Sequence, residues 1–422
     1  MHQSYGKLIK LTRIEKNIKQ EDLCEGICTP SYLSRIENDR VVADEQVYKL
    51  LLEKLGVELN PNIADIEQIN SEIEQWYEQI LMNEESSINV EALKERARST
   101  NDETYVKFKL IYCRYLLNLN KLEEVNKYIS SLEKSIPSFN KRLNFLFTNL
   151  MILFYYKNKQ YTKAVESAEK FINSGQLDSL IKPIEKAIFY YNLAINFKKL
   201  YQYEESIKFT KQALDIFKEW YFLEFALQCH VLLGICYNNS LKFERAIHYY
   251  EGAQKIIPFL SKKNHSYYFS IIDNNIGNCY ENINDYKRAL HYYIKSYENE
   301  ENDDKMTSVV NIIRCYYKSG NLKQANSWLE VAKNYIQQNT SDKHVYQLKI
   351  FKLVLHNDNL PIEELKTLEI ECMQYFTTER MINYIIFYSK VFAQLYKERN
   401  LYKKASEMFE LALLTIERRR RT

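Results

Sequence analysis

The hydrophobic pattern of the chain has a helical period and recurs in paired segments. In one clear copy, the aliphatic Leu233 and the small Gly234 are followed one turn later by the aromatic Tyr237. After a polar segment come two small residues and one aromatic residue, which are Ala246, Ala253 and Tyr250. Apolar positions three or four residues apart lie on one face of a helix. The copy therefore predicts two amphipathic helices joined by a turn, with small residues where the helices approach each other.

The same spacing recurs along most of the chain. The small position of successive copies falls at Ile80, Cys113, Ile152, Ala194, Gly234, Gly277, Ile313, Leu353 and Ala393, which are 33 to 43 residues apart. Periods of this size are typical of solenoids, in which each helix pair packs on the next. The pattern resembles the tetratricopeptide repeat. This resemblance implies an all-α fold with a right-handed α-solenoid of about nine repeats.

Residues 1–56 do not follow the repeat and predict four short helices instead. Thr29 and Pro30 are residue types preferred at a helix N-cap and at the first helical position. The segments Gln20-x-x-Leu23 and Ser31-x-Leu33-Ser34-Arg35-Ile36-Glu37-Asn38 resemble the helix-turn-helix of the lambda-repressor-like (XRE) family. The resemblance covers nearly the whole segment and implies a DNA-binding module.

The docking geometry of such modules suggests which residues contact DNA. The second helix of the motif enters the major groove by its N-terminal end. Pro30, Ser31 and Arg35 are therefore expected to face base edges, with Arg35 suited to a bidentate contact with guanine. Gln20 opens the preceding helix, where its side chain and backbone N–H can bind phosphate. The phosphate backbone is expected to face Arg13, Tyr32, Asn38 and Arg40.

The charge of the module leaves an alternative open. Residues 1–56 contain nine Lys and Arg and nine Asp and Glu, so the module is neutral. A module that makes only protein contacts would have this composition. Because nonspecific affinity for DNA depends on neutralising phosphates, one copy should bind weakly. DNA binding is therefore expected to involve a dimer, which places two modules on two half-sites.

Composition narrows the fold and the function. Glycine and proline number 8 and 6, whereas average usage would give about 50 together, and this deficit argues against β-sheet folds. The formal net charge is only +3, and the run Arg418 to Arg421 accounts for it.

The eight cysteines show no metal-binding spacing. Cys236, Cys279 and Cys315 share one repeat position, which indicates that they are packing residues. No segment predicts a membrane span, so a cytoplasmic protein without metal or cofactor is expected.

The combination of a helix-turn-helix with a long solenoid resembles the RNPP family (Rap, NprR, PlcR, PrgX) of peptide-pheromone receptors, and most of all its NprR branch. We accordingly predict a DNA-binding domain at residues 1–56, a linker at 57–70 and a repeat domain for peptide binding and oligomerisation at 71–422. The resemblance implies a quorum-sensing transcription regulator whose partners are promoter DNA and a short signalling peptide. It also implies a homodimer or a higher homo-oligomer.

A peptide site is expected on the first helices of the repeats, which line the concave face of a solenoid. Asparagine carries a donor and an acceptor for a peptide backbone, yet it is a poor helix former, so its abundance in these helices requires an explanation. Asn192, Asn275 and Asn311 recur at one repeat position and suggest a ladder; the composition of an AT-rich genome is the alternative explanation. The other candidate peptide-binding residues are Asn196, Asn238, Asn278, Tyr317, and Arg114 and Arg314, whose cations could hold a peptide carboxylate.

Two rival functions remain open, and enzymatic activity has no support. The seven histidines are scattered and no catalytic motif or paired carboxylates occur, so we predict no catalytic residues. The chain could instead be a signalling adaptor whose repeats sequester a phosphorelay or other protein partner. A phage arbitrium-type peptide receptor has the same layout. The peptide, the operator and the sign of regulation do not follow from the sequence.

Overall fold

The computed structural model describes residues 5–58, 63–85, 88–135, 140–175, 181–300, 305–336, 340–356 and 360–421. In these ranges the chain forms α-helices and a few short 3-10 helices, with no strand. It divides into two compact units, residues 1–200 and 201–422. The all-α fold with a helix-turn-helix and a repeat solenoid is therefore confirmed.

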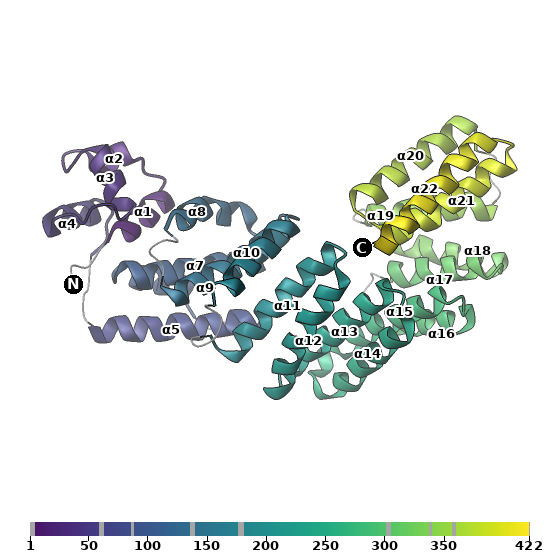
Figure 1. Ribbon diagram of the computed structural model, residues 1–422, viewed down its shortest axis with the longest axis horizontal. Coiled ribbons are helices and arrows are strands. Elements are labelled where there is room, and N and C mark those ends of the chain that lie inside the picture. The colour runs from purple at the N-terminus through teal and green to yellow at the C-terminus, as the bar shows by residue number, and fades with distance from the viewer. Residues whose placement is uncertain are drawn as a thin grey trace. The chain divides into compact units, whose positions relative to one another are not determined.

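Each unit consists of short helical elements joined by tight turns (Figure 1). Unit 1 contains α1 (Gly6–Glu15), α2 (Gln20–Cys24), α3 (Pro30–Glu37), α4 (Glu45–Lys54), α5 (Ile63–Met82), α6 (Val90–Arg98), α7 (Asp102–Asn118), α8 (Leu122–Ser135), α9 (Lys141–Lys157), α10 (Tyr161–Asn173) and α11 (Pro183–Lys199). Unit 2 contains α12 (Tyr203–Glu219), α13 (Leu223–Asn239), α14 (Phe243–Ile256), α15 (His265–Asn282), α16 (Tyr286–Asn299), α17 (Met306–Lys318), α18 (Leu322–Ala332), α19 (Asp342–His356), α20 (Ile362–Thr378), α21 (Ile382–Glu398) and α22 (Tyr402–Arg421).

Helices α1 to α4 form the predicted N-terminal module. The Thr29 hydroxyl accepts a hydrogen bond from the Tyr32 backbone N–H and caps α3, and Pro30 occupies the first helical position, as predicted. Asp44 caps α4 in the same way. The core of the module is apolar, and its buried residues include Leu8, Ile9, Leu23, Leu33, Ile36, Leu51 and Leu52. The module therefore has a small core of its own.

The module also packs closely on the repeat helices of unit 1. Helix α1 contacts α7 and α8 (Figure 1). The buried carboxylate of Asp102 accepts hydrogen bonds from the backbone N–H groups of Lys7 and Leu8, at 3.1 and 2.8 Å, at the first turn of α1. Burial raises the pKa of Asp102 to about 7. The predicted linker at 57–70 stays a prediction, because Pro61 lies outside the described residues and α5 begins at Ile63, within that range.

At the other end of α1, Glu15 joins the module to α6 and α7. Its carboxylate lies 2.5 Å from Lys94 Nζ, 2.7 Å from Arg98 Nη2 and 2.9 Å from Lys109 Nζ. The Lys109 side chain is fully buried, and its Nζ also lies 4.7 Å from the centre of the Tyr128 ring. The two ends of α1 are thus fixed to the repeats by carboxylates, of which Asp102 is buried and Glu15 is partly buried.

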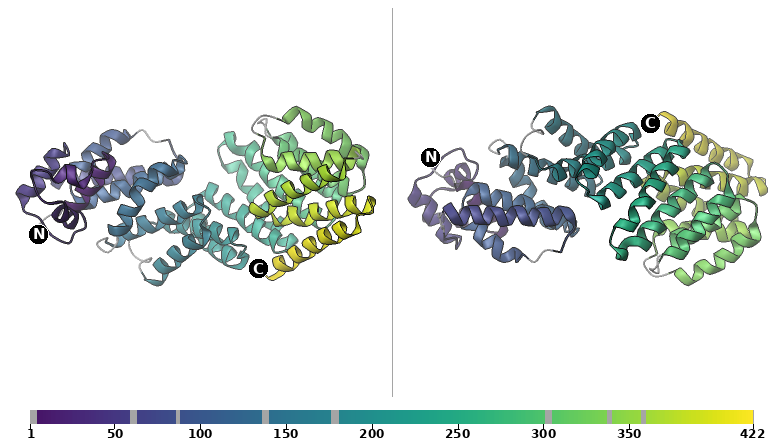
Figure 2. Two further views of the ribbon diagram at one scale, coloured as in Figure 1. Left: turned by 90° about the horizontal axis from the view of Figure 1, so that it is seen from above. Right: turned by 90° about the horizontal axis from the view of Figure 1, so that it is seen from below.

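In unit 2 the helices from α12 to α18 pack in chain order as antiparallel pairs (Figure 2). A Cβ atom at Gly234 would lie 2.4 Å from the ring of Tyr250, and one at Gly277 would lie 2.7 Å from the ring of Tyr293. Both rings are fully buried. These glycines therefore let a tyrosine of the second helix pack against the first, as the small repeat position predicts.

The turns inside the repeats use residues in the left-handed backbone region. Asn120, Lys159 and Gly320 have φ values of 59°, 58° and 79°. They lie in the turns between α7 and α8, between α9 and α10, and between α17 and α18. Cys236, Cys279 and Cys315 are buried and free, in agreement with their predicted packing role.

Candidate DNA-binding and peptide-binding sites

Helix α3 presents a polar face to solvent. Leu33 and Ile36 are fully buried, whereas Pro30, Ser31 and Arg35 are exposed. The three side chains predicted to read bases are therefore accessible together on one helix. Asn38 and Arg40, which follow α3, are exposed as well, and Tyr32 is half-buried.

Arg13, which is predicted to face phosphate, forms hydrogen bonds within the module. Its Nε and Nη2 donate to the two carboxylate oxygens of Glu37 at 2.6 and 2.8 Å, and its Nη1 donates to the Ile18 carbonyl at 2.9 Å. Gln20 donates to the same carboxylate at 2.7 Å. Because Glu37 is 1% exposed, this cluster binds α1, α2 and α3 together. Sequence reasoning missed Glu37, although it follows Leu33 by one helical turn and so lies on the buried face.

A second polar contact lies beside the recognition helix. The Asn38 side-chain amide donates to the Ser34 carbonyl at 2.7 Å, and its oxygen accepts a hydrogen bond from Lys10 Nζ at 2.8 Å. Lys10 was not among the predicted site residues. Its stem is buried while its ammonium reaches the predicted phosphate-facing residue, which is common for long cationic side chains.

Unit 2 contains a polar groove with a volume of about 540 Å³. It brings together four of the predicted peptide-binding residues, Asn275, Asn278, Asn311 and Arg314. The other lining residues come from α15, α16, α17, α21 and the turn between α15 and α16. They are Asn274, Glu281, Asn282, Asn284, Tyr286, Thr307, Lys318, Asn383, Tyr384, Ile386, Phe387 and Lys390.

The asparagines of unit 2 form side-chain hydrogen bonds between neighbouring repeats. The Asn238 amide donates to Asn278 at 2.8 Å, and the Asn311 amide donates to Asn274 at 2.8 Å. Asn275 donates instead to the Ile271 carbonyl of its own helix. The ladder thus differs from the one predicted, because the side chains that meet do not share one repeat position.

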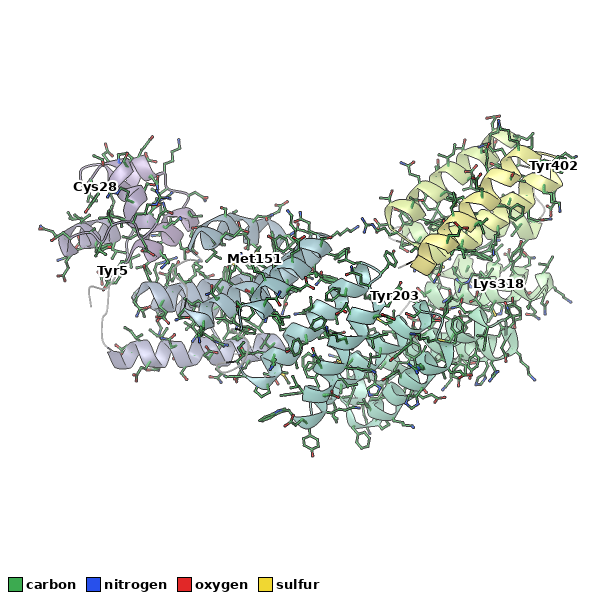
Figure 3. All side chains as sticks on the ribbon, in the orientation of Figure 1. Tyr5, Cys28, Met151, Tyr203, Lys318 and Tyr402 are labelled. Atoms are coloured by element: carbon green, nitrogen blue, oxygen red, sulfur yellow. The ribbon has the colours of Figure 1, made fainter. Side chains whose placement is uncertain are left out.

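Arg314 is neutralised within the protein. Its Nε and Nη2 each lie 2.8 Å from a carboxylate oxygen of Glu281, and Lys318 Nζ lies 2.8 Å from Oε1 of the same group. Burial by itself would raise the pKa of Glu281, but the cations of Arg314 and Lys318 hold it well below its usual value. A peptide carboxylate at Arg314 would compete with Glu281. Lys318, at the end of α17 (Figure 3), and Lys390 add positive charge to the groove.

The remaining predicted peptide residues are not among those that line this groove. Tyr317 packs edge-on against Phe351 and Phe387, with ring centres 5.9 and 6.4 Å apart. Arg114, Asn192 and Asn196 belong to unit 1. The Asn196 amide donates to the Asn192 carbonyl at 2.9 Å. Arg114 is buried, and burial lowers its pKa.

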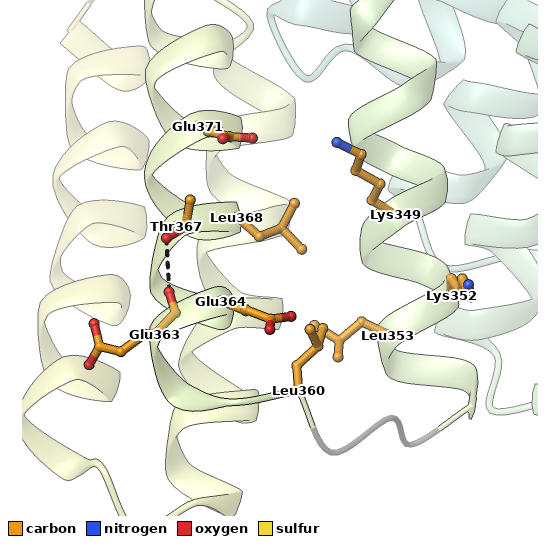
Figure 4. Close-up of a pocket in the computed structure, with 9 residues that line it drawn as sticks. All are labelled: Lys349, Lys352, Leu353, Leu360, Glu363, Glu364, Thr367, Leu368 and Glu371. Carbon is orange, nitrogen blue, oxygen red and sulfur yellow. Dashed lines mark hydrogen bonds between the residues drawn. The ribbon is translucent and has the colours of Figure 1, made fainter.

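A second cavity of unit 2 contains none of the predicted site residues. It has a volume of about 510 Å³ and lies between α19 and α20 (Figure 4). Lys349 and Lys352 come from α19, and the acidic residues Glu363, Glu364 and Glu371 come from α20. The Thr367 hydroxyl donates to the Glu363 carbonyl at 2.9 Å, which is the bond drawn in the figure. Its lining combines two lysines, three glutamates and three leucines. The sequence pattern predicts no ligand for this combination.

In the part of the chain that the structure describes, no group of three or more His, Cys, Asp or Glu side chains could hold a metal ion. Among the same residues, no helix is both long and apolar enough to cross a membrane.

Comparison with known proteins agrees with this organisation. A helix-turn-helix family model matches residues 9–61. The transcriptional activator NprA of Geobacillus stearothermophilus is 25% identical over 404 residues, which cover 92% of this chain and 98% of that protein. Among solved structures, the apo form of the quorum sensor NprR from B. thuringiensis has a TM-score of 0.67 at 16% identity, covering 83% of this chain and 99% of the other. NprR in complex with its cognate peptide NprX has a TM-score of 0.58 at 15% identity, with coverages of 83% and 99%.

These relatives are regulators, which agrees with the prediction that the chain is not an enzyme. The structural similarities lie below 25% identity and support the fold. The relation to NprA extends along nearly the whole chain and includes the N-terminal module. The helix-turn-helix, the solenoid and the similarity to NprA agree with the resemblance to the RNPP family that the sequence shows.

Proposed function

We propose that the chain is a quorum-sensing transcription regulator that binds promoter DNA through α2 and α3 and is controlled by a short signalling peptide held by its repeats. The observation that carries this proposal is the accessible face of Ser31 and Arg35 in a module of helix-turn-helix type. The description of the related NprA as a transcriptional activator supports it.

DNA recognition would follow from the chemistry of α3. A guanidinium can donate two hydrogen bonds to guanine O6 and N7, which is the most common specific contact in the major groove. The side chain of Arg35 is exposed, and its backbone lies within the helix α3. The neutral charge of residues 1–56 argues for two modules on two half-sites, and hence for a homodimer or a higher homo-oligomer.

Replacing Arg35 with alanine should weaken binding to the specific site about 10- to 100-fold, because a bidentate base contact contributes about 1–3 kcal/mol of discrimination. Binding is measured by fluorescence anisotropy on a duplex from the region upstream of the coding sequence, and on a scrambled duplex of equal length and composition. Arg35→Ala should bind the two duplexes almost equally.

Arg40→Ala provides the comparison for this experiment. As a residue expected at the phosphate backbone, Arg40 should contribute equally to both duplexes, and its loss should reduce the salt dependence of binding. Binding by Arg35→Ala that is unchanged on both duplexes would remove Arg35 from the interface. Absence of specific binding by the unchanged protein would contradict the proposal itself.

The groove of unit 2 is the proposed peptide site. Its amide side chains offer donors and acceptors to a peptide backbone, and Lys318 and Lys390 could attract an anionic group. In unit 1, Nε and Nη1 of buried Arg114 have no hydrogen-bond partner among the described residues. A peptide carboxylate would satisfy such donors. We propose each place, taken by itself, as a candidate peptide contact.

Asn278→Ala should weaken peptide binding about tenfold, because it removes one amide that can bond to the peptide and breaks the pairs with Asn238 and Asn282. Binding is measured by isothermal titration with synthetic peptides from the product of the adjacent reading frame, where peptides of this family are often encoded. Asn326→Ala is the matched control, since it breaks one side-chain hydrogen bond, to His356, on a second helix outside the groove. Equal affinities of the two variants would exclude Asn278 from the site.

The expected place of action is the cytoplasm, where promoter DNA is accessible. A protein partner such as a phosphorelay component remains the alternative function. Binding of such a partner by residues 62–422, without DNA, would favour it.

A further inference from the structure

A polar cavity lies between the N-terminal module and the repeat helix α8. Its volume is about 720 Å³. The repeat domain contributes Ser130 and Ser131 of α8, while the module contributes Lys10, Arg13, Ile14, Lys19, Gln20, Glu21, Pro30, Ser34, Glu37 and Asn38. A helix of the solenoid therefore shares one cavity with four of the residues predicted to contact DNA, which are Arg13, Gln20, Pro30 and Asn38. Helix α8 also contacts α1 directly (Figure 1).

The chemistry of this cavity suits a phosphodiester group. It contains the cations Lys10, Lys19 and Arg13 against the carboxylates Glu21 and Glu37, which leaves one net positive charge. Because Arg13 and Glu37 are paired, the two lysines provide the attraction for an anion. Hydroxyl groups of Ser34 and Ser130 line the same space and can donate hydrogen bonds to phosphate oxygens.

The position of the cavity matches the path of a DNA strand. In a helix-turn-helix, the second helix occupies the major groove while the first crosses the backbone. Ser31 and Arg35 remain exposed with α8 in place, so α8 leaves the base-reading face open. The cavity lies at the side of this face, where Gln20 and Asn38 would meet phosphates.

We propose that a phosphate of the DNA backbone enters this cavity and that α8 forms its outer wall. The proposal rests on the DNA-binding function proposed above and extends the interface from the module to the repeats. Exposed Lys127 precedes Ser130 and Ser131 by three and four residues and so shares their face of α8. Part of the phosphate contacts that the neutral module lacks would then come from the solenoid.

Charge changes at Ser130 test this arrangement, because Ser130 is exposed and its replacement leaves the core intact. Ser130→Lys should raise affinity about fivefold at about 100 mM salt for both the upstream duplex and a scrambled duplex. It should also steepen the slope of log affinity against log salt by about 0.9. Ser130→Asp should lower affinity for both duplexes by a similar factor. Ser327→Lys makes the same charge change at an exposed serine on α18 and serves as the control.

The outcomes separate this inference from the proposed function. If the unchanged full-length protein binds the upstream duplex but both Ser130 variants behave like Ser327→Lys, α8 is not part of the interface, and DNA binding by the module stands. If Ser130→Lys weakens binding while Ser130→Asp strengthens it, the cavity does not receive a phosphate and the inference is wrong. If the unchanged protein shows no preference for the upstream duplex and Arg35→Ala has no effect, the proposed function fails. Hydrogen exchange across α1 and α8 confirms that the variants retain the docked module.

Discussion

Replacing Glu281 with glutamine should lower the free energy of unfolding of unit 2 by about 3–5 kcal/mol, because it leaves a buried guanidinium without its carboxylate. Arg314 and Glu281 are only 7% and 2% exposed. Glu281 also accepts a hydrogen bond from Tyr293 at 2.7 Å and pairs with Lys318. Glutamine keeps the size of the side chain, so the loss reports the charge rather than a cavity.

The pH dependence of this effect has a definite sign. The pKa of Glu281 is held far below its usual 4.5 in the folded protein, since Arg314 and Lys318 outweigh the effect of burial. The ionised carboxylate therefore stabilises unit 2 fully above pH 4.5, and this stabilisation is lost as the pH falls further. Glu281→Gln should lose less stability on acidification than the unchanged protein.

Urea unfolding followed by circular dichroism, with hydrogen exchange to locate the change in α15 and α17, measures both effects. Glu363→Gln is the control, because its carboxylate is 83% exposed and pairs with Lys366 at the surface. A surface pair of this kind contributes at most about 1 kcal/mol. Similar losses in the two variants would show that the Glu281 cluster does not hold unit 2 together.

Glu15→Gln should destabilise unit 1 by about 3–5 kcal/mol and loosen α1 from the repeats. This single carboxylate faces Lys94, Arg98 and Lys109, and the Lys109 side chain is fully buried. Removing its charge leaves a buried ammonium unpaired and places three cations near one another. The Tyr105 hydroxyl, which donates to Glu15 at 3.1 Å, would keep an acceptor.

The measurement is urea unfolding with hydrogen exchange in α1 and α7. Burial favours the neutral form of Glu15, but the neighbouring lysines and Arg98 lower its pKa from 4.5 to about 2. Its contribution is therefore complete above pH 4.5 and disappears as the pH falls towards about 2. Glu91→Gln, which removes a 71% exposed partner of Lys94, should change stability by less than about 1 kcal/mol. Unaltered exchange in α1 of Glu15→Gln would refute the proposed anchoring role.

The DNA-binding face was partly predictable from the sequence. The resemblance to helix-turn-helix modules predicts that Pro30, Ser31 and Arg35 face base edges, and the structure leaves all three exposed on α3. The same resemblance suggests that Arg13 faces the phosphate backbone, but it does not predict the ion pair of Arg13 with Glu37. This pairing joins residues separated by 24 positions and depends on how α1 crosses α3. The shared cavity with Ser130 and Ser131 joins still more distant segments.

For the groove of unit 2, too, the sequence predicts some features and only the tertiary structure shows the others. Periodicity placed the six candidate asparagines on the first helices of the repeats, and four of them lie in unit 2. It could not predict that Asn238 would meet Asn278 or that Asn311 would meet Asn274. Those partners depend on the offset between neighbouring helix pairs, and the intervals between copies vary from 33 to 43 residues.

The sequence by itself determined the helix pairs, the small residues at their crossings and the N-terminal helix-turn-helix. These features depend on local spacing, in which each side chain's face follows from its place in a helix. Only the tertiary structure decided which charges are buried together, as with Glu15 and Lys109 or Glu281 and Arg314. It also decided that the DNA-binding module packs on α7 and α8. The physical reason is that burial and ion pairing depend on distances between helices, which side-chain periodicity within one helix does not encode.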